Sequence, residues 1–170
     1  MQPATTPAIP VEVRIRPAQP TDLPFILALV PRLNAFGPPA WRDPAHMTQF
    51  DRDVLTRAVL EPTPDHHVFI AETTQPAGLL HLSSSTDYYQ QTHAHIADLI
   101  VDAAAEGQGV GRALLAYAET WARDHGFATL ALSVFAQNTH ARSVYQKAGF
   151  GEDMITCIKS LHPHASREVE

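Results

Sequence analysis

The stretch that decides the fold is residues 99–115, LIVDAAAEGQGVGRALL, which runs from Leu99 to Leu115. It begins as an apolar strand, passes through three alternating glycines, and continues at once as an amphipathic helix. At a helix N-terminus the first backbone N–H groups have no intrahelical acceptor, so they can bind a phosphate. The stretch therefore predicts a strand, an anion-binding loop and a helix, in that order.

Composition and charge narrow the class of protein. The chain has 170 residues, 45% hydrophobic and 18% charged, which predicts a single domain over residues 11–161 with flexible tails at 1–10 and 162–170. The formal net charge of −6 argues against a nucleic-acid-binding protein, which is usually basic. A single cysteine, Cys157, excludes an intramolecular disulfide, and no apolar run approaches the ~18 residues of a membrane span. We expect a cytoplasmic protein that binds neither nucleic acid nor a membrane.

Apolar spacing and proline positions predict the remaining elements. Strands are expected at 11–16, 68–71, 78–82, 96–102, 129–135 and 154–161. Helices are expected after a Thr21-Asp22 cap and at 47–60, 111–125 and 138–149. The polar segment 83–91 is expected to be a loop. Strands and helices mixed in this order predict an α/β (α+β) fold.

The glycine loop does not match two common phosphate-binding motifs. A Walker loop needs Gly-Lys followed by Ser or Thr, and this loop has none. The dinucleotide fingerprint has the spacing G-x-G-x-x-G and follows the first strand, whereas these glycines are spaced G-x-G-x-G and lie beyond the middle of the chain.

Two blocks together resemble one family. Glu106–Gly111 resembles the pyrophosphate signature Q/R-x-x-G-x-G/A of the GNAT superfamily of N-acetyltransferases. The second block, Asn138-x-x-Ala141-x-x-x-Tyr145-x-x-x-Gly149-Phe150, resembles that superfamily's second characteristic block. The order of strands and helices is also similar, from about residue 11 to 161. The resemblance implies a mixed, mostly antiparallel central sheet of about six or seven strands flanked by about four helices.

The resemblance implies an activity and its partners. The donor would be acetyl-CoA, and the acetyl group would pass to a small-molecule or peptide amine by direct attack within a ternary complex. Relatives often dimerise, so a homodimer is compatible with the resemblance, although the sequence shows no decisive interface. An alternative is a non-catalytic GNAT-like module that binds acyl-CoA, and a third is a nucleotide-binding regulator.

The same resemblance implies the residues that bind acetyl-CoA. The expected set is Ile100, Val101, Gly107, Gln108, Gly109, Val110, Gly111, Arg112, Asn138 and Tyr145. One position departs from the family pattern, because Glu106 stands where Arg or Gln is usual. A carboxylate repels a pyrophosphate unless it points to solvent, and Arg112 is expected to compensate in part.

Catalytic roles also follow from the resemblance. Tyr145 would protonate the departing thiolate, since reference pKa values of ~10 for tyrosine and ~8.5 for a thiol are not far apart. A backbone N–H near Ile100 and Val101 would stabilise the oxyanion. Asp98 is the first candidate for the base that deprotonates the acceptor. His93, His95 or a chain of water molecules are the alternatives.

Metal binding and the acceptor site are less defined by the sequence. His93 and His95 would point the same way from a strand, but no Cys or carboxylate pattern completes a metal site, and no metal is expected. In GNAT folds the acceptor side is built from the first two helices and nearby loops. Here these contain Phe36, Trp41 and the pair Tyr88-Tyr89, although Trp41 could equally be a packing residue.

Overall fold

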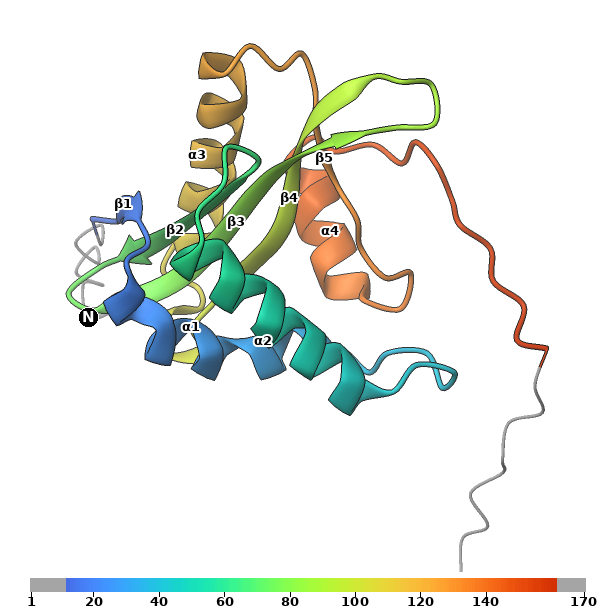
Figure 1. Ribbon diagram of the computed structural model, residues 1–170, viewed down its shortest axis with the longest axis horizontal. Helices are drawn as coiled ribbons and strands as arrows, with labels where there is room; N and C mark the ends of the chain where they lie inside the picture. Colours follow the sequence, from blue (N-terminus) through green and yellow to red (C-terminus); the bar gives the residue numbers. More distant parts are fainter. Residues whose placement is uncertain (1–11, 162–170) are drawn as a thin grey trace, which may run out of the picture.

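A mixed sheet forms the centre of the structure, a computed structural model that describes residues 12–161 (Figure 1). In this part of the chain the sheet has five strands, in the spatial order β1-β2-β3-β4-β5. The strands are β1 Arg14–Pro17, β2 His66–Glu72, β3 Pro76–Thr86, β4 Thr92–Val101 and β5 Leu130–Leu132. The first four pair antiparallel in chain order, and β5 pairs parallel with β4.

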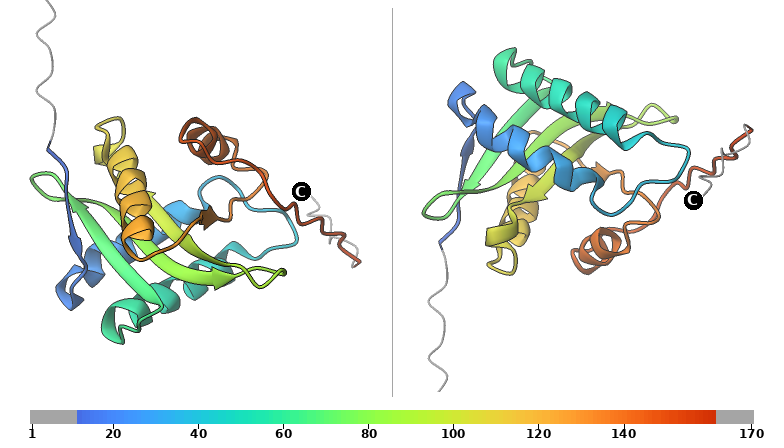
Figure 2. Two further views of the ribbon diagram at one scale, coloured as in Figure 1. Left: turned by 90° about the horizontal axis from the view of Figure 1, so that it is seen from above. Right: turned by 90° about the horizontal axis from the view of Figure 1, so that it is seen from below.

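Helices cover both faces of the sheet (Figure 2). One face carries α1 Leu23–Leu29 and α2 Pro44–Leu60, and the opposite face carries α3 Val110–Asp124 and α4 Thr139–Lys147. Short 3-10 turns are η1 Pro20–Asp22, η2 Val30–Asn34 and η3 Ala103–Ala105.

Strand alternation divides the core into two clusters. On β3, Leu80 and Leu82 pack on the α3 side with Leu114, whereas Leu79 packs on the α1–α2 side with Leu55. Successive side chains of a strand point to opposite faces, so a strand whose neighbouring leucines enter different clusters, as Leu79 and Leu80 do, is buried on both sides. This two-sided burial makes β3 and β4 the rigid centre of the fold.

The pairing of β4 changes halfway along the strand. His81 pairs with Asp98 and Leu82 pairs with Ile96, so Ala97 is an extra residue that forms a β-bulge. The parallel pairing with β5 ends at the same point, because the last of its pairs is Ile96 with Leu132. Among the described residues, segment 97–101 of β4 therefore has a paired neighbour on the β3 side alone.

The predicted fold class is confirmed, but the strand count is not. The expected strand at 154–161 is absent, and residues 151–161 are irregular and mostly exposed as they extend away from the domain (Figure 1). A strand needs a partner for its backbone groups, and β5, which has three residues, offers only a short edge. The expected strand at 129–135 is shortened to β5, because its pairing with β4 is limited to residues 94–96.

The predicted loop at 83–91 is strand over residues 83–86 and a turn over 87–91. β3 continues to Thr86, β4 begins at Thr92, and the turn between them is fixed by Asp87. Its Oδ1 accepts hydrogen bonds from the N–H groups of Tyr89, at 2.8 Å, and Gln91, at 2.9 Å. Polar composition indicated a loop here because both strands of this hairpin are partly exposed near its tip.

Two further expectations concern the chain ends and membranes. The flexible tails expected at 1–10 and 162–170 lie outside the described residues. Among the helices of residues 12–161, none combines the length and apolarity that crossing a bilayer requires.

Packing of α3 on β3 predicts a large cost for truncating Leu114. Its side chain is fully buried, so Leu114→Ala should lower the free energy of unfolding by about 2–5 kcal/mol through lost burial and a cavity. Leu60→Ala is the matched control, since Leu60 is 52% exposed, and should change stability by less than about 0.5 kcal/mol. Urea unfolding measures both, and equal effects would contradict this core.

Candidate active site

The glycine loop has the backbone conformation that its glycines permit. Gly107 has φ +75° and Gly109 has φ +86°, in the left-handed region that side chains disfavour, and Gly109 caps α3. The N–H of Ala113 donates to Gly109 O at 3.0 Å as the first bond of the helix. The N–H groups of Val110, Gly111 and Arg112 precede that bond and have no acceptor inside α3.

Not every N–H of the loop is available to an anion. The N–H of Glu106 donates to Ala103 O at 3.4 Å, and that of Gln108 donates to Ala105 O at 3.3 Å. These two bonds stabilise the loop itself, whereas the sequence predicted bare N–H groups at the helix N-terminus. The donors suited to a phosphate therefore lie in the first turn of α3.

Arg32 compensates for the unusual Glu106. Its guanidinium forms an ion pair with Glu106 Oε1, and its Nε donates to Val101 O at 2.9 Å. The arginine from η2 thus joins the end of β4 to the glycine loop and neutralises the carboxylate. The sequence predicted that Arg112 would compensate in part, and the ion pair of Arg32 with Glu106 joins residues 74 positions apart.

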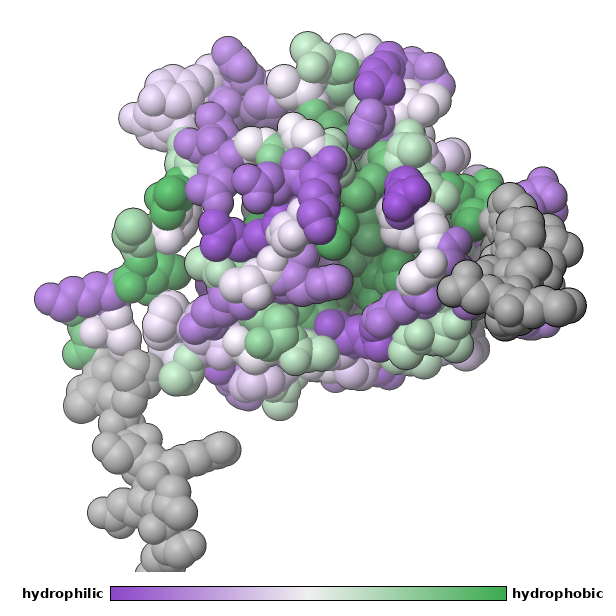
Figure 3. Space-filling view, turned by 180° about the vertical axis from the view of Figure 1, so that it is seen from behind, coloured by the Kyte–Doolittle hydropathy of each residue, from purple (hydrophilic) through white to green (hydrophobic). Residues whose placement is uncertain are grey.

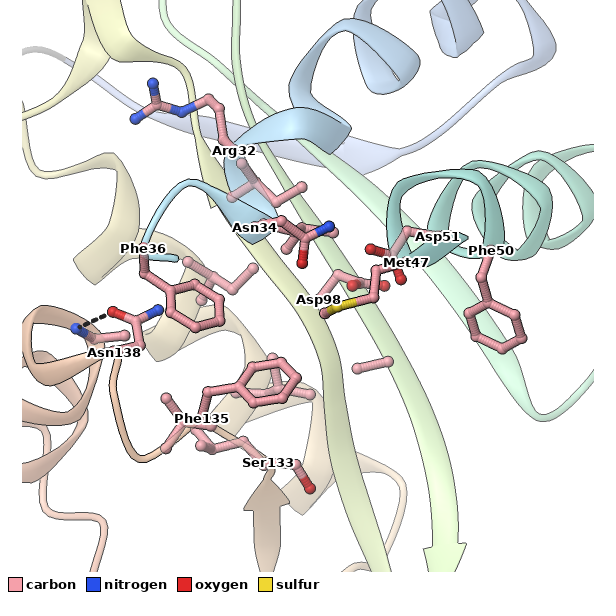
Figure 4. Close-up of a pocket in the computed structure, with 18 of the residues that line it drawn as sticks. Arg32, Asn34, Phe36, Met47, Phe50, Asp51, Asp98, Ser133, Phe135 and Asn138 are labelled. Carbon is pink, nitrogen blue, oxygen red and sulfur yellow. Dashed lines mark hydrogen bonds between the residues drawn. The ribbon is translucent and has the colours of Figure 1, made fainter. Parts of the chain in front are cut away.

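A cavity of about 460 Å³ lies beside the unpaired part of β4 (Figure 4). Its walls come from η2, α2, segment 96–100 of the sheet, the chain after β5, and α4. Four predicted site residues line it: Asp98, Ile100, Asn138 and Tyr145. Val101 and the glycine loop lie outside its lining. On the α3–α4 face the molecule is hollowed, with hydrophobic surface at the bottom of the hollow (Figure 3).

Aromatic rings form one wall of the cavity. Phe36 stacks on Phe135 with ring centroids 5.1 Å apart, and the guanidinium of Arg42 lies 5.2 Å from the centre of the Phe135 ring. Phe36, which was expected on the acceptor side, lines the cavity. Trp41, 46% exposed, does not line the cavity, and neither do Tyr88 and Tyr89 at the tip of the β3–β4 hairpin.

Two carboxylates share the cavity. Asp51 from α2 and Asp98 from β4 both line it, and Figure 4 shows them on the same side. Burial, and secondarily the charge of Asp98, raise the pKa of Asp51 to about 6, against a smaller lowering effect of Asn34. Sequence reasoning missed Asp51. Asp51, Leu55 and Val59 follow one another at intervals of four residues, which places Asp51 on the core-facing side of the helix.

Asn138 and Tyr145, from the second predicted block, line the cavity, with Asn138 across from the two carboxylates in Figure 4. Asn138 caps α4, because its Oδ1 accepts a hydrogen bond from the N–H of Ala141 at 3.1 Å, as expected. Among the contacts of residues 12–161 its side-chain amide N–H₂ makes no hydrogen bond, and Asn138 lines the cavity. Burial raises the pKa of the Tyr145 phenol, and the charge of Asp98 adds to this, so the phenol stays protonated at neutral pH.

Comparisons with known proteins identify the family. The sequence model of the acetyltransferase (GNAT) family matches residues 28–150. The chain belongs to the GNAT family of acetyltransferases. An uncharacterized N-acetyltransferase of Bacillus subtilis (strain 168), YycN, is 32% identical over 111 residues, which cover 64% of this chain and 69% of that protein.

Solved structures show the same fold. A putative acetyl transferase from Pyrococcus furiosus is 22% identical, with a TM-score of 0.70, 88% of this chain covered and 100% of the other. An aminoglycoside N-acetyltransferase solved in complex with CoA is 18% identical, with a TM-score of 0.64, 89% of this chain covered and 96% of the other. At these identities the likeness concerns the GNAT fold alone.

The candidate bases of this GNAT chain are not equally placed. Asp98 lines the cavity, and its Oδ2 lies 2.9 Å from Nδ1 of His81, a buried histidine that sequence reasoning missed. His93 lies outside the cavity lining and contacts Asp87, with Nε2 3.0 Å from Oδ2. His95 also lies outside it, and burial lowers the pKa of its imidazole.

No metal-binding group is found in residues 12–161, where no three or more His, Cys, Asp or Glu side chains gather in a suitable cluster. Cys157 is exposed in the irregular C-terminal segment. It does not line the cavity.

The raised pKa of Asp51 predicts how stability depends on pH. The folded protein holds the Asp51 proton up to about pH 6, whereas the unfolded chain loses it near 3.8. The native state thus binds more protons in this window, so this group's contribution to the free energy of unfolding falls as pH rises from about 4 to about 6. Asp51→Asn should remove that contribution, as measured by urea unfolding across this range.

The control for Asp51 is a second aspartate on α2. Asp53 lies outside the cavity and accepts a hydrogen bond from Gln49. Asp53→Asn should therefore keep the pH dependence of the wild-type protein. A wild-type slope in Asp51→Asn would show that Asp51 is not desolvated in solution.

Proposed function

We propose that this chain transfers the acetyl group of acetyl-CoA to a primary amine by direct attack within a ternary complex. The observation that carries the proposal is segment 97–101 of β4, whose edge away from β3 has no partner strand among the described residues. It borders a cavity lined by Asp98 and Tyr145, and it leads along the chain into the glycine loop. A thioester held along this segment would lie between an acid and a base.

Backbone donors support the cofactor assignment. The first turn of α3 would bind the diphosphate through the N–H groups of Val110, Gly111 and Arg112, with Gly107, Gln108 and Gly109 shaping the loop. Ile100 and Val101 would bind the pantetheine arm through backbone groups, and Asn138 through its side-chain amide. The CoA bound by the aminoglycoside N-acetyltransferase of the same fold supports this choice of donor.

The side chains supply a proton-transfer path. Asp98 removes a proton from the acceptor ammonium, and the neutral nitrogen attacks the thioester carbonyl. A backbone N–H of the unpaired segment stabilises the negative charge that develops on the carbonyl oxygen. The Tyr145 phenol, kept protonated by its raised pKa, gives its proton to the departing CoA thiolate.

The two carboxylates support a cationic acceptor, although Arg32 and Arg42 also line the cavity. Asp51 and Asp98 line one side, and burial, with the charge of Asp98 second, raises the pKa of Asp51. A positively charged amine beside them would offset the repulsion between the two carboxylates. Phe36 and Phe135 add an aromatic wall that suits an organic amine. The cavity, about 460 Å³, suits a small-molecule acceptor or the end of a peptide.

An acceptor screen tests the proposal most directly. Purified protein and acetyl-CoA are mixed with amines of several classes, and free thiol is measured with and without each amine. Amine-dependent thiol release supports the enzyme. Tight acetyl-CoA binding without release for any amine would contradict transfer and favour a non-catalytic acyl-CoA-binding module.

Replacing the proposed acid should lower turnover. Tyr145→Phe keeps the ring and removes the hydroxyl, so kcat should fall by about 100-fold while the Kd for acetyl-CoA changes little. Tyr117→Phe is the control. Tyr117 of α3 is also partly buried, but it packs against Phe69 of β2 and does not line the cavity. Unchanged turnover in Tyr145→Phe would remove Tyr145 from the acid role.

Replacing a loop glycine should weaken cofactor binding. Gly109→Ala places a side chain at φ +86°, which costs about 1–2 kcal/mol, and relief of this strain would move the N–H groups of α3. Calorimetry should show about tenfold weaker acetyl-CoA binding. Gly151→Ala, where an added Cβ meets open space, should bind normally. Equal affinities would argue against this loop as the diphosphate site.

A further inference from the structure

A histidine lies buried in the middle of the sheet. His81 on β3 is 1% exposed, and its neighbours on the strand, Leu80 and Leu82, are fully buried apolar residues. Placing an imidazole in such surroundings costs free energy unless both ring nitrogens are hydrogen-bonded. A histidine at this position in an apolar strand therefore calls for an explanation in terms of its two partners.

The two partners of His81 form a chain across three strands. Nδ1 of His81 lies 2.9 Å from Oδ2 of Asp98 on β4, and Nε2 lies 2.9 Å from Nδ1 of His66 on β2. His66 is exposed at the start of β2, and Asp98 lines the cavity. The chain thus connects the candidate base to the protein surface on the α1–α2 side of the sheet.

The chemistry of the three groups fixes the direction of these hydrogen bonds. An ionised carboxylate only accepts, so Nδ1 of His81 carries the proton and donates to Asp98. In neutral His81 the other nitrogen, Nε2, then accepts, and Nδ1–H of His66 donates to it. Burial, and next the neighbouring His81, lower the pKa of His66, which favours the neutral ring in this arrangement.

We propose that His81, held in one tautomer by His66, is the positioning residue of Asp98, a role that rests on the proposed function. His81 binds Oδ2 and leaves Oδ1 to take the acceptor's proton. In that step an N–H bond of the ammonium breaks and an O–H bond forms on Asp98. The carboxylate becomes a neutral acid, and His81 keeps its own proton.

Other ionisable groups face this chain, and their contributions must be separated from it. They are Asp51 of α2, His95 of β4 and Tyr145 of α4 around Asp98, and Asp65 and His67 beside His66. None of them donates a hydrogen bond to Asp98 among the contacts of residues 12–161. His81 is accordingly the group whose removal takes a donor from the ionised carboxylate.

Kinetics of matched variants test the proposal. His81→Leu should lower kcat by about tenfold or more, with little change in KM for acetyl-CoA, because a charged carboxylate loses its donor. The acidic limb of the kcat/KM profile should move to higher pH, since the ionised form loses stabilisation. His66→Ala should act in the same direction with a smaller loss, about two- to tenfold. His81→Gln, whose amide can donate, should restore part of kcat.

The neighbouring His67 provides the control. It adjoins His66, but its Nε2 lies 2.9 Å from Pro64 O and its ring packs against Trp121 on the other face of the sheet. His67→Ala should keep the wild-type kcat and pH profile. An acidic limb that stays in place in both His81→Leu and His66→Ala would overturn the proposal, as would an equal shift in His67→Ala.

A spectroscopic readout keeps the test independent of activity. Long-range ¹H–¹⁵N spectra of the wild-type protein should show His81 protonated at Nδ1 only, and His66→Ala should give a mixture of tautomers. A proton on Nε2 with none on Nδ1 in the wild-type protein would overturn the proposal, even if His81→Leu fails to fold. Failure of the proposed function would appear differently, as no amine-dependent turnover by the wild-type protein despite the expected tautomer.

Discussion

The structure depends on one change in strand pairing, at the middle of β4. Up to Ile96 the strand has β3 on one side and β5 on the other, and from the bulge at Ala97 onward it pairs, within residues 12–161, with β3 alone. Backbone N–H and C=O groups need partners, so an unpaired stretch within a folded domain is suited to bind a ligand with amide groups of its own. The cavity, its two carboxylates and the tyrosine of α4 all surround this stretch. Because β5 no longer pairs with β4 beyond Ile96, β4 separates there from the chain after β5 and from α4, and the cavity lies between them.

Charge around this opening is balanced by contacts between distant segments. Arg32 offsets Glu106 and at the same time binds the carbonyl of Val101, so one side chain links the 3-10 turn, the end of β4 and the glycine loop. This pairing explains how a loop with a carboxylate at its first position remains compatible with an anionic ligand. Glu106 alone therefore gives no reason to prefer a binding module over an enzyme.

Patterns between residues close in the sequence predicted most of what was predicted correctly, whereas contacts between distant residues were not predicted. Glycine spacing and helical periodicity predicted the loop, α3 and the Asn138 cap, because each depends on neighbours within about four residues. The strand expected at 154–161 was wrong because apolar alternation says nothing about whether a partner strand is present. Arg32 and Glu106, 74 positions apart, could not be paired from one sequence. Asp51 and His81 did leave a signal, as polar residues at core-facing positions.

The proposed function requires the thioester and the diphosphate to follow one continuous path, from the opening beside β4 to the first turn of α3. A crystal structure of the protein with bound CoA tests it directly. We expect the diphosphate to lie within hydrogen-bonding distance of the N–H groups of Val110 to Arg112, and the thiol to lie in the cavity near Tyr145. A diphosphate bound away from the glycine loop, or a pantetheine arm that does not contact segment 97–101, would contradict it.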